Sequence, residues 1–360
     1  MIVQSIELEK FRNYKSLKLK FDSGTNIFYG DNAQGKTNIL EAVYLCGTTK
    51  SHRGSKDREV IQFQEEESHL RMKVERNNVP IEIDMHLKKN KPKGIAINGV
   101  PIRKASELFG IANFVFFSPE DLNIIKDGPS VRRHFIDMEL CQLHKVYLHH
   151  LSNYNKVINQ RNRLLKESAF RPDILDTLDI WDIQMAEYGK KVIEERRAFI
   201  RRLNEIIDSI HGRLTGEKEH LRIIYEENVT AEEFAEALRS SREKDLRMKM
   251  SMTGPHRDDI CFQTNGVDIR KFGSQGQQRT AALSLKLSEI ELVKQEIGDT
   301  PILLLDDVLS ELDSSRQKYL LDSIHDIQTF ITCTGLDDFV QNRFHINKVF
   351  HVVEGKVYEN

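Results

Sequence analysis

One glycine-rich stretch near the start of the chain has the residue types and the spacing of a phosphate-binding loop. Residues 30–37 read Gly-Asp-Asn-Ala-Gln-Gly-Lys-Thr and fit the pattern G-x-x-x-x-G-K-[ST], with a strand-like run before them and a helical pattern after them. The glycines let backbone N–H groups curl toward phosphate oxygens, Lys36 reaches the β- and γ-phosphates, and Thr37 offers a hydroxyl to Mg²⁺. The chain is therefore predicted to bind a nucleoside triphosphate through Gly30, Asp31, Asn32, Ala33, Gln34, Gly35, Lys36 and Thr37.

A pair of carboxylates at the end of a strongly apolar run is the second candidate for chemistry. The run Ile302–Leu305 reads as a buried strand and is followed by Asp306 and Asp307. A carboxylate at this place is the further Mg²⁺ ligand that a phosphate loop needs. We predict Thr37 and Asp306 as the metal ligands and Asp307 as the general base for the attacking water. Lys36, Asp306 and Asp307 form the predicted catalytic set.

A third motif opens a helix about thirty residues before the two aspartates. Ser274-Gln-Gly-Gln-Gln-Arg279 places a Ser-x-Gly-Gln segment at a helix N-terminus, where free N–H groups and the helix dipole favour a γ-phosphate. We predict nucleotide contacts from Ser274, Gly276 and Gln277. Together with Ser310-Glu-Leu-Asp313, which follows the aspartates, this order resembles ABC-type ATPases, whose signature motif reaches the nucleotide of a partner subunit.

The elements around these motifs predict an α/β fold. Residues 1–29 read as three strands, the helix after Lys36 ends near Gly47, and 69–75 with 81–86 read as a hairpin. Asn98-Gly99 is a type I′ turn signal. Further strands are expected at 114–117, 259–263, 301–306, 329–334 and 351–353. The predicted fold class is an ABC-type P-loop ATPase head, with mixed and parallel sheets around the P-loop helix.

A helical region interrupts this β texture. Ser118-Pro119 is a helix start, and from residue 128 to about 212 two stripes, Leu140–Ile158 and Leu178–Val192, predict two antiparallel helices with a break at Phe170-Arg-Pro172. A third helix is predicted to begin at Thr230. We therefore predict a discontinuous ATPase head, residues 1–117 and 251–360 (lobe I), and a short helical arm subdomain, residues 118–250 (lobe II).

Composition limits the classes of function. The 360 residues are 39% apolar and 30% charged, with no run long enough to span a bilayer and no signal peptide, so a soluble, cytoplasmic protein is expected. The four cysteines have no metal-binding or redox spacing and are expected to be reduced thiols. With a net charge of −2, any contact with DNA must come from local basic patches.

The motifs taken together resemble the RecF family of bacterial recombination and repair ATPases, which is related to the SMC heads. The resemblance spans nearly the whole chain and is carried by Phe11-Arg-Asn-Tyr14, residues 30–37, Phe117-Ser-Pro-Glu-Asp-Leu122, Gly254-Pro-His-Arg-Asp-Asp259, residues 274–279 and residues 305–313. It implies ATP as the nucleotide, with Arg12 and Asn13 among its contacts, and a homodimer that forms with ATP. It also implies slow, DNA-stimulated hydrolysis, binding to single-strand/double-strand junctions and single-stranded DNA, help in recombinase loading and the SOS response, and the partners RecR and RecO.

The chain departs from the ABC pattern at three positions. Asp307 stands where a glutamate is usual, and this shorter base predicts slow hydrolysis. The switch histidine would fall near Cys333 and Thr334, and neither can perform its role. No glutamine stands at the expected loop around Ser118. Which residues replace these last two groups is left open by the sequence.

Basic residues that could contact DNA phosphates occur in several patches. Arg53, Lys56 and Arg58 are the preferred candidates, because a comparable arginine after the first helix senses DNA in SMC-like heads. No aromatic residues are interleaved with them, so backbone contacts without sequence readout are expected. The other candidates are Lys50, residues 88–93, Arg132, Arg133, Arg161, Arg163, Arg196, Arg197, Arg201 and Arg202.

Other classes of function stay open at this point. A transporter-type ABC ATPase subunit would share the motifs, although the missing switch histidine and the helical arm speak against it. A catalytically weak interaction scaffold is the other alternative, and intact Lys36, Thr37 and both aspartates speak against that. A repair nuclease fused to this head would need an acidic metal-binding cluster outside the nucleotide site, and the sequence shows none.

Overall fold

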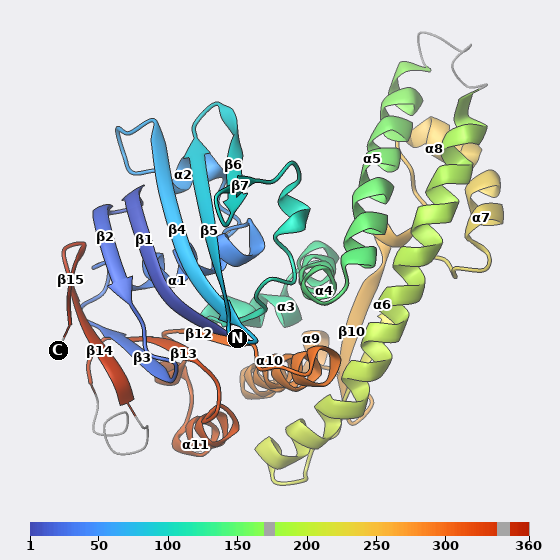
Figure 1. Ribbon diagram of the computed structural model, residues 1–360. Coiled ribbons are helices and arrows are strands. Elements are labelled where there is room, and N and C mark those ends of the chain that lie inside the picture. Colours follow the sequence, from blue (N-terminus) through green and yellow to red (C-terminus); the bar gives the residue numbers. More distant parts are fainter. Residues whose placement is uncertain (169–176, 337–345, 360) are drawn as a thin grey trace. The chain divides into compact units, whose positions relative to one another are not determined.

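The computed structural model describes residues 1–168, 177–336 and 346–359, and these form two compact units (Figure 1). The first unit contains residues 1–121 and 289–360, and the second contains residues 122–288. The second unit therefore includes residues 251–288, which the sequence assigned to the head. The functional division into an ATPase head and an arm stays a prediction.

One sheet of the first unit is antiparallel throughout. Its strands are β1 (Ile2–Phe11), β2 (Tyr14–Lys20), β4 (Glu67–Arg76), β5 (Val79–Lys88), β6 (Lys91–Ile97) and β7 (Val100–Pro101), in the order β2-β1-β4-β5-β6-β7. In β4 buried Ser68, Leu70, Met72 and Val74 alternate with outward-facing residues, which is the pattern of a sheet with one covered face. The predicted hairpin is confirmed, as is the Asn98-Gly99 turn, where both residues have positive φ (51° and 76°).

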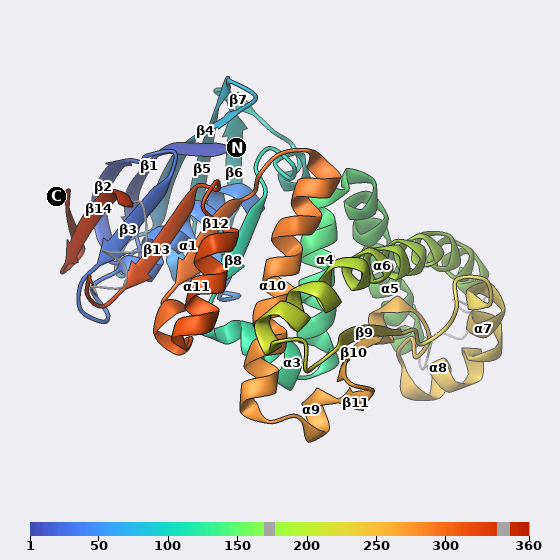
Figure 2. The same cartoon turned by 90° about the horizontal axis from the view of Figure 1, so that it is seen from below.

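The other sheet of the first unit is mostly parallel (Figure 2). Its strands are β3 (Thr25–Tyr29), β8 (Phe114–Phe117), β12 (Ile302–Asp306), β13 (Thr329–Cys333), β14 (Ile346–Val353) and β15 (Lys356–Glu359), in the order β15-β14-β3-β13-β12-β8. Only β15, at one edge, runs antiparallel to its neighbour. Parallel strands buried on both faces read as continuous apolar runs, and all five residues of β12 are buried.

The helix α1 (Lys36–Thr48) follows β3 and contacts strands of both sheets. It is buried on nearly all sides from Ile39 to Thr48, which explains why its apolar residues show no narrow stripe. The prediction of mixed and parallel sheets around this helix is confirmed. The shorter helical segments of the first unit are α2 (Asp57–Val60), η1 (Ala105–Glu107), η2 (Pro119–Asp121), η5 (Leu309–Glu311) and α11 (Ser314–Ser323).

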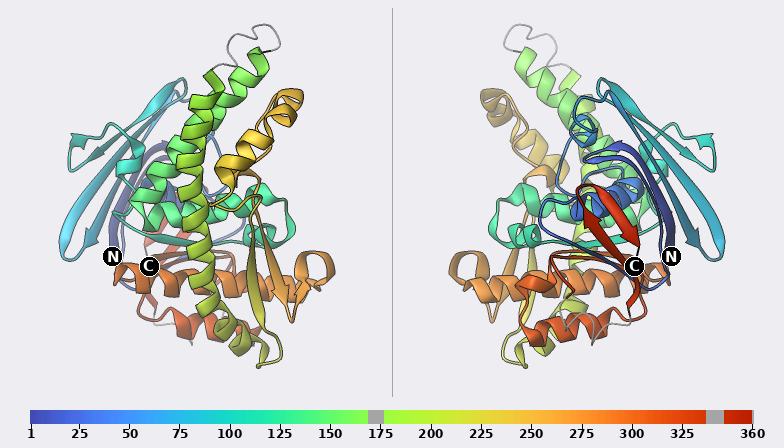
Figure 3. Two further views of the ribbon diagram at one scale, coloured as in Figure 1. Left: turned by 90° about the vertical axis from the view of Figure 1, so that its right-hand side faces the viewer. Right: turned by 90° about the vertical axis from the view of Figure 1, so that its left-hand side faces the viewer.

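The second unit is mainly helical, and its longest helices α5 and α6 pack side by side (Figures 1 and 3). Its helices are α3 (Leu122–Lys126), α4 (Pro129–Leu143), α5 (Lys145–Glu167), α6 (Leu178–Thr215), α7 (Phe234–Ser240), α8 (Arg242–Met248), η4 (Pro255–Arg257) and α9 (Ile269–Phe272). A small antiparallel sheet completes it, with β9 (Leu221–Glu226), β10 (Asp259–Thr264) and β11 (Val267–Asp268). The long helix α10 (Gln275–Ile297) begins in this unit and continues into the first.

Two predictions about this unit were wrong in detail. The stripe from Leu140 to Ile158 belongs to two helices, because His144 has an extended backbone (φ −128°, ψ 102°) that ends α4 before α5 begins. The helix predicted at Thr230 begins at Phe234, and Thr230 instead accepts a hydrogen bond from the Glu233 N–H (3.2 Å) in the preceding turn. The predicted break at Phe170–Pro172 lies outside the described residues. Within the described ranges, no helix has the length and apolar character needed to cross a bilayer.

Candidate nucleotide-binding site

The loop between β3 and α1 has a backbone that only its glycines can adopt at two positions. Gly30 has φ 146° and Gly35 has φ 116°, both in the region that side chains disfavour. A Cβ on Gly30 would lie 2.3 Å from the Val352 carbonyl oxygen, and one on Gly35 would lie 2.4 Å from Asn13 Nδ2. The loop also contacts the turn after β14, where the Gly355 N–H donates to the Gln34 carbonyl (3.2 Å) and the Glu354 N–H donates to Gln34 Oε1 (2.5 Å). The phosphate loop is therefore held by hydrogen bonds from the turn after β14.

Lys36 is the first residue of α1, and its side chain folds back over this loop. Its ammonium donates to the carbonyl oxygens of Gly30 (2.6 Å) and Asp31 (2.7 Å). Burial lowers the pKa of Lys36, and the nearby carboxylates of Asp307 and Asp306 oppose that shift. Phosphate oxygens that replace these two carbonyls carry full negative charge, so the hydrogen bonds of the Lys36 ammonium become stronger when phosphate binds.

Thr37 and Asp306 come from distant parts of the sequence and meet at one point. Thr37 Oγ1 donates to Asp306 Oδ1 (2.7 Å), and the same oxygen accepts from Thr332 Oγ1 (2.7 Å). Burial raises the pKa of Asp306, while the two hydroxyl donors oppose the shift. Adjacent oxygen ligands of octahedral Mg²⁺ lie about 2.9 Å apart. The Thr37–Asp306 pair fits this spacing, so the predicted ligands suit Mg²⁺.

Asp307 is held in an unusual backbone conformation beside this pair. Its φ is 54°, its N–H donates to Thr332 Oγ1 (3.0 Å), and its carbonyl accepts from Ser310 Oγ (2.8 Å). A non-glycine residue in the left-handed region costs free energy and is retained where the surroundings determine it. The conformation turns the chain sharply after β12, so that the neighbouring carboxylates of Asp306 and Asp307 both line one cavity.

These residues line a cavity of about 200 Å³ in the first unit. Two of its lining residues, Asn38 and Thr332, were missed by the sequence analysis. Thr332 is the second-last residue of β13, the parallel neighbour of β12, and strand ends at the same sheet edge could have indicated it. The complete lining is Asn32, Ala33, Gly35, Lys36, Thr37, Asn38, Arg53, Asp306, Asp307 and Thr332.

The two residues before Tyr14 have different surroundings. Asn13 lies against the phosphate loop, where its Nδ2 donates to the Gln34 carbonyl (2.9 Å) and its Oδ1 accepts from Asn38 (2.9 Å). Arg12 instead forms two hydrogen bonds with the buried carboxylate of Glu41 (2.6 and 2.8 Å). Direct nucleotide contact by Arg12 and Asn13 stays a prediction.

The helix-opening motif lies in the second unit and has its own N-terminal cap. The Ser274 N–H donates to Gln277 Oε1 (2.9 Å), and the Gln277 N–H donates to Ser274 Oγ (3.2 Å). Ser274 and Gly276 are exposed, and a Cβ on Gly276 would meet only Ser274 Oγ, at 3.8 Å. The start of α10 is therefore exposed, and contact of these residues with a nucleotide stays a prediction.

The structure separates the basic candidates into exposed and buried residues. Arg53, Lys56 and Arg58 are exposed, and Arg53 also reaches the nucleotide cavity, with Nη1 3.5 Å from Asn38 Oδ1. The prediction of an exposed basic patch was wrong for three arginines of the second unit. These three side chains are buried and form ion pairs: Arg132 with Asp259 (2.6 Å), Arg161 with Asp182 (2.6 Å) and Asp245 (2.7 Å), and Arg196 with Asp137 (2.8 Å) and Asp258 (3.2 Å).

A phosphate loop joined to a strand-end aspartate in this sheet order defines an ABC-type P-loop ATPase head. The family model described as the RecF/RecN/SMC N-terminal domain matches residues 2–357. The chain is 63% identical over 357 residues to the DNA replication and repair protein RecF of Agathobacter rectalis, covering 99% of each chain. It is 43% identical to the RecF protein of Clostridium tetani, covering 100% of each. The chain belongs to the RecF family.

Solved structures agree with this assignment. A structure of the recombination mediator protein RecF with ATP, in the RecFOR pathway, matches with a TM-score of 0.94 and 38% identity, covering 100% of this chain and 97% of that chain. The corresponding RecF-ATPrS structure has a TM-score of 0.91 and 37% identity, covering 99% and 97%. An Smc head bound to the C-winged helix domain of ScpA matches with a TM-score of 0.57 at 16% identity, covering 100% and 98%, and shows the fold alone.

Proposed function

We propose that this chain is an ATP-dependent DNA-binding protein of replication and recombinational repair, in which ATP is the switch of a homodimer. The observation that carries the proposal is the cluster of Lys36, Thr37 and Asp306 around one cavity in a chain of the RecF family. A RecF structure that matches over the whole of this chain has been solved with ATP, which supports ATP as the nucleotide.

The chemistry of the site follows from its side chains. Thr37 and Asp306 would hold Mg²⁺, whose positive charge would offset the negative charge of the β- and γ-phosphates. Lys36 and the backbone N–H groups of residues 30–37 bind the phosphate oxygens. Asp307, which also lines the cavity, orients and deprotonates the attacking water. Its short side chain gives slow hydrolysis, which suits a switch that must persist long enough to be read.

Two copies of the chain share each nucleotide in this proposal. One copy supplies residues 30–37, Asp306 and Asp307, and the other supplies Ser274, Gly276 and Gln277 at the exposed N-terminus of α10. Because the γ-phosphate touches both copies only before hydrolysis, it is the contact that differs between the closed and the open state. ATP binding therefore closes the dimer, and hydrolysis releases it.

DNA is bound through phosphate contacts, with Arg53, Lys56 and Arg58 as the preferred residues. Because Arg53 also lines the nucleotide cavity, it is suited to couple DNA binding to hydrolysis and to make hydrolysis DNA-stimulated. The preferred substrates are single-strand/double-strand junctions and single-stranded DNA, and the biological role is assistance to recombinase loading and the SOS response in the cytoplasm. RecR and RecO are the proposed partners, supported by relatives assigned to the RecFOR pathway.

Sedimentation of the wild type and Ser274→Arg, with and without ATP and Mg²⁺, tests the switch. The wild type should dimerise with ATP at micromolar concentration, whereas Ser274→Arg should bind a fluorescent ATP analogue normally and stay monomeric. A wild type that stays monomeric with ATP and Mg²⁺ contradicts the proposal. Binding of the same proteins to gapped and to uniform duplex DNA tests the DNA preference. Lys56→Glu and Arg58→Glu should weaken this binding, and Lys166→Glu is the control because Lys166 is an exposed residue of α5.

A further inference from the structure

The outward face of the β4–β5 hairpin is organised as a ladder of opposed side chains. Three of its rungs pair opposite charges: Glu67 with Lys88 (3.1 Å), Arg71 with Asp84 (2.6 Å) and Lys73 with Glu82 (3.3 Å). Directly opposed charges of opposite sign stabilise a pair of strands. The charged residues on this face are therefore matched to their partners across the strands.

One rung of this ladder breaks the pattern. His69 lies directly opposite His86, and their rings stack with centroids 3.7 Å apart and an interplanar angle of 25°. Two imidazolium ions at this distance would repel, so the pair fits the charge pattern only when at least one ring is neutral. A neutral imidazole has a free nitrogen lone pair, which is the form that binds metal ions.

A carboxylate completes the group. Glu67 lies two residues before His69 on the same face of β4, and its Oε2 is 3.1 Å from Nε2 of His86. Lys88 Nζ lies 3.1 Å from the same carboxylate oxygen. On β6 the residue opposite His86 is Gly94, which has no side chain to cover the imidazole.

We propose that Glu67, His69 and His86 form a binding site for a divalent transition-metal ion of the Zn²⁺ class, separate from the nucleotide site. One ligand atom from each residue lies within 4.8 Å of the others. In tetrahedral coordination at about 2.0–2.2 Å, neighbouring ligand atoms are about 3.4 Å apart. The His86–Glu67 distance already meets this value, and rotation of the exposed His69 side chain brings in the third ligand. Water occupies the fourth position.

The donor set selects the class of ion. Two imidazole nitrogens and one carboxylate favour Zn²⁺, Co²⁺ or Ni²⁺ over Mg²⁺ and Ca²⁺, which prefer oxygen ligands. Lys88 competes for the Glu67 carboxylate in the metal-free form, at 3.1 Å. Metal binding therefore releases Lys88 and joins β4 to β5 through side chains, which stabilises the hairpin.

Cobalt titration of the full-length protein, without ATP or Mg²⁺, tests the site. The wild type should take up one Co²⁺ ion with the visible d–d absorption of nitrogen and oxygen ligands, and Zn²⁺ should displace it. Absorption by cobalt–thiolate bonds would assign the ion to cysteine and overturn the proposal. His69→Gln and His86→Gln should each weaken Co²⁺ binding by at least about tenfold. His220→Gln is the matched control, because His220 is an exposed histidine that faces a single carboxylate, Asp208.

Lys88→Gln should change the Co²⁺ affinity in the opposite direction, an increase that loss of folding cannot produce. It frees Glu67 from its ion pair, so Co²⁺ should bind more tightly than to the wild type, and the Zn²⁺-induced rise in melting temperature should grow. Equal Co²⁺ affinity in the wild type, His69→Gln and His86→Gln would refute the site, as would no binding at about 100 μM Co²⁺. Since no ATP is present, either result is independent of the proposed ATP switch.

Discussion

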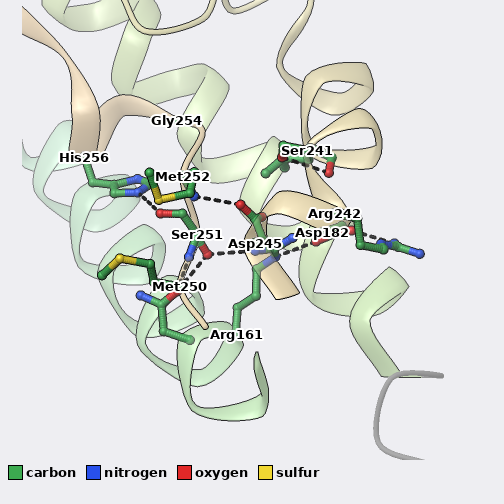
Figure 4. Close-up of polar contacts among 12 residues, drawn as sticks. Arg161, Asp182, Ser241, Arg242, Asp245, Met250, Ser251, Met252, Gly254 and His256 are labelled. Atoms are coloured by element: carbon green, nitrogen blue, oxygen red, sulfur yellow. Dashed lines mark hydrogen bonds and ion pairs between the residues drawn. The ribbon is translucent and has the colours of Figure 1, made fainter. Parts of the chain in front are cut away.

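Arg161 and Asp245 form an ion pair of 2.7 Å in which both side chains are completely buried. Arg161 also donates to Asp182 (2.6 Å) and to Ser251 Oγ (2.8 Å), so one guanidinium connects α5, α6, α8 and the segment after α8 (Figure 4). That segment leads directly into Gly254-Pro-His-Arg-Asp-Asp259, one of the motifs that carried the family resemblance. Within the second unit, this network fixes the start of that motif on the helical pair.

Arg161→Ala should destabilise the protein strongly, because it leaves the buried carboxylate of Asp245 without its cation, while Asp182 keeps its ion pair with Arg242 (2.6 Å). The expected loss in the free energy of unfolding is about 3–5 kcal/mol. Arg163→Ala is the matched control, since Arg163 on the same helix forms only an exposed pair with Glu167 and should change the stability by less than about 1 kcal/mol. Urea denaturation followed by circular dichroism measures both. Similar losses in the two variants would refute the role of the network.

Protonation of His256 should destabilise the folded state in acid. Nε2 of His256 donates to the Ser251 carbonyl (3.0 Å; Figure 4), and Nδ1 accepts from the Tyr154 hydroxyl (2.7 Å), an arrangement that requires a neutral ring. Burial lowers the pKa of His256 to about 4. Because the folded-state pKa lies below the unfolded value of about 6.5, this group's contribution to stability is complete above pH 6.5 and is lost as the pH falls toward 4.

His256→Gln therefore flattens the dependence of stability on pH between 6.5 and 4, by at most about 1.4 kcal/mol per pH unit. Melting temperatures across this range measure the change. His52, whose pKa burial also lowers to about 4, keeps its own contribution to the slope in this variant. His220→Gln, at an exposed position, should leave the slope as in the wild type. An unaltered slope in His256→Gln would contradict the assignment.

Lys36→Ala should abolish ATP binding without unfolding the protein. The ammonium makes hydrogen bonds only to two loop carbonyls among its described contacts, so the side chain contributes little to the core. Fluorescent ATP-analogue titration should show no saturable binding, and the melting temperature without nucleotide should stay within about 2 °C of the wild type. A large fall in that melting temperature would show that Lys36 has a structural role instead.

Substitution of the two neighbouring aspartates should separate metal binding from hydrolysis. Asp307→Asn should keep ATP binding and ATP-dependent dimerisation while hydrolysis falls by about 10²–10⁴-fold, the usual contribution of a general base. Asp306→Asn should instead weaken the Mg²⁺ dependence of ATP binding, because it removes an anionic ligand. Steady-state hydrolysis and equilibrium binding at several Mg²⁺ concentrations distinguish the two. Equal effects of both changes on Mg²⁺ dependence would mean that Asp307 is also a ligand.

The sequence predicted most of the nucleotide cavity because its residues lie in local motifs. Gly35, Lys36 and Thr37 are consecutive residues where the loop meets α1, and Asp306 ends an apolar run that reads as a strand by itself. Thr332 was missed because its role arises from the pairing of β13 with β12, which is a long-range contact. The end of α4 at His144 was also missed, since the apolar stripe continues through the break.

The basic patches show a different limit of sequence reasoning. A run of charge indicates a solvated surface unless a partner is known, and the partners of Arg132, Arg161 and Arg196 lie between 21 and 127 positions away along the chain. Tertiary packing therefore decided their environment. The His69–His86 pair has the same origin, because only the register of two strands places these residues face to face.

The phosphate loop rests against Val352, Glu354 and Gly355, in the last hairpin of the chain. On the ribosome, the loop is therefore made more than 300 residues before the backbone that supports it. A nascent chain therefore carries the whole nucleotide-binding motif early, yet the hydrogen bonds that Glu354 and Gly355 donate to that motif form only after these residues have been made.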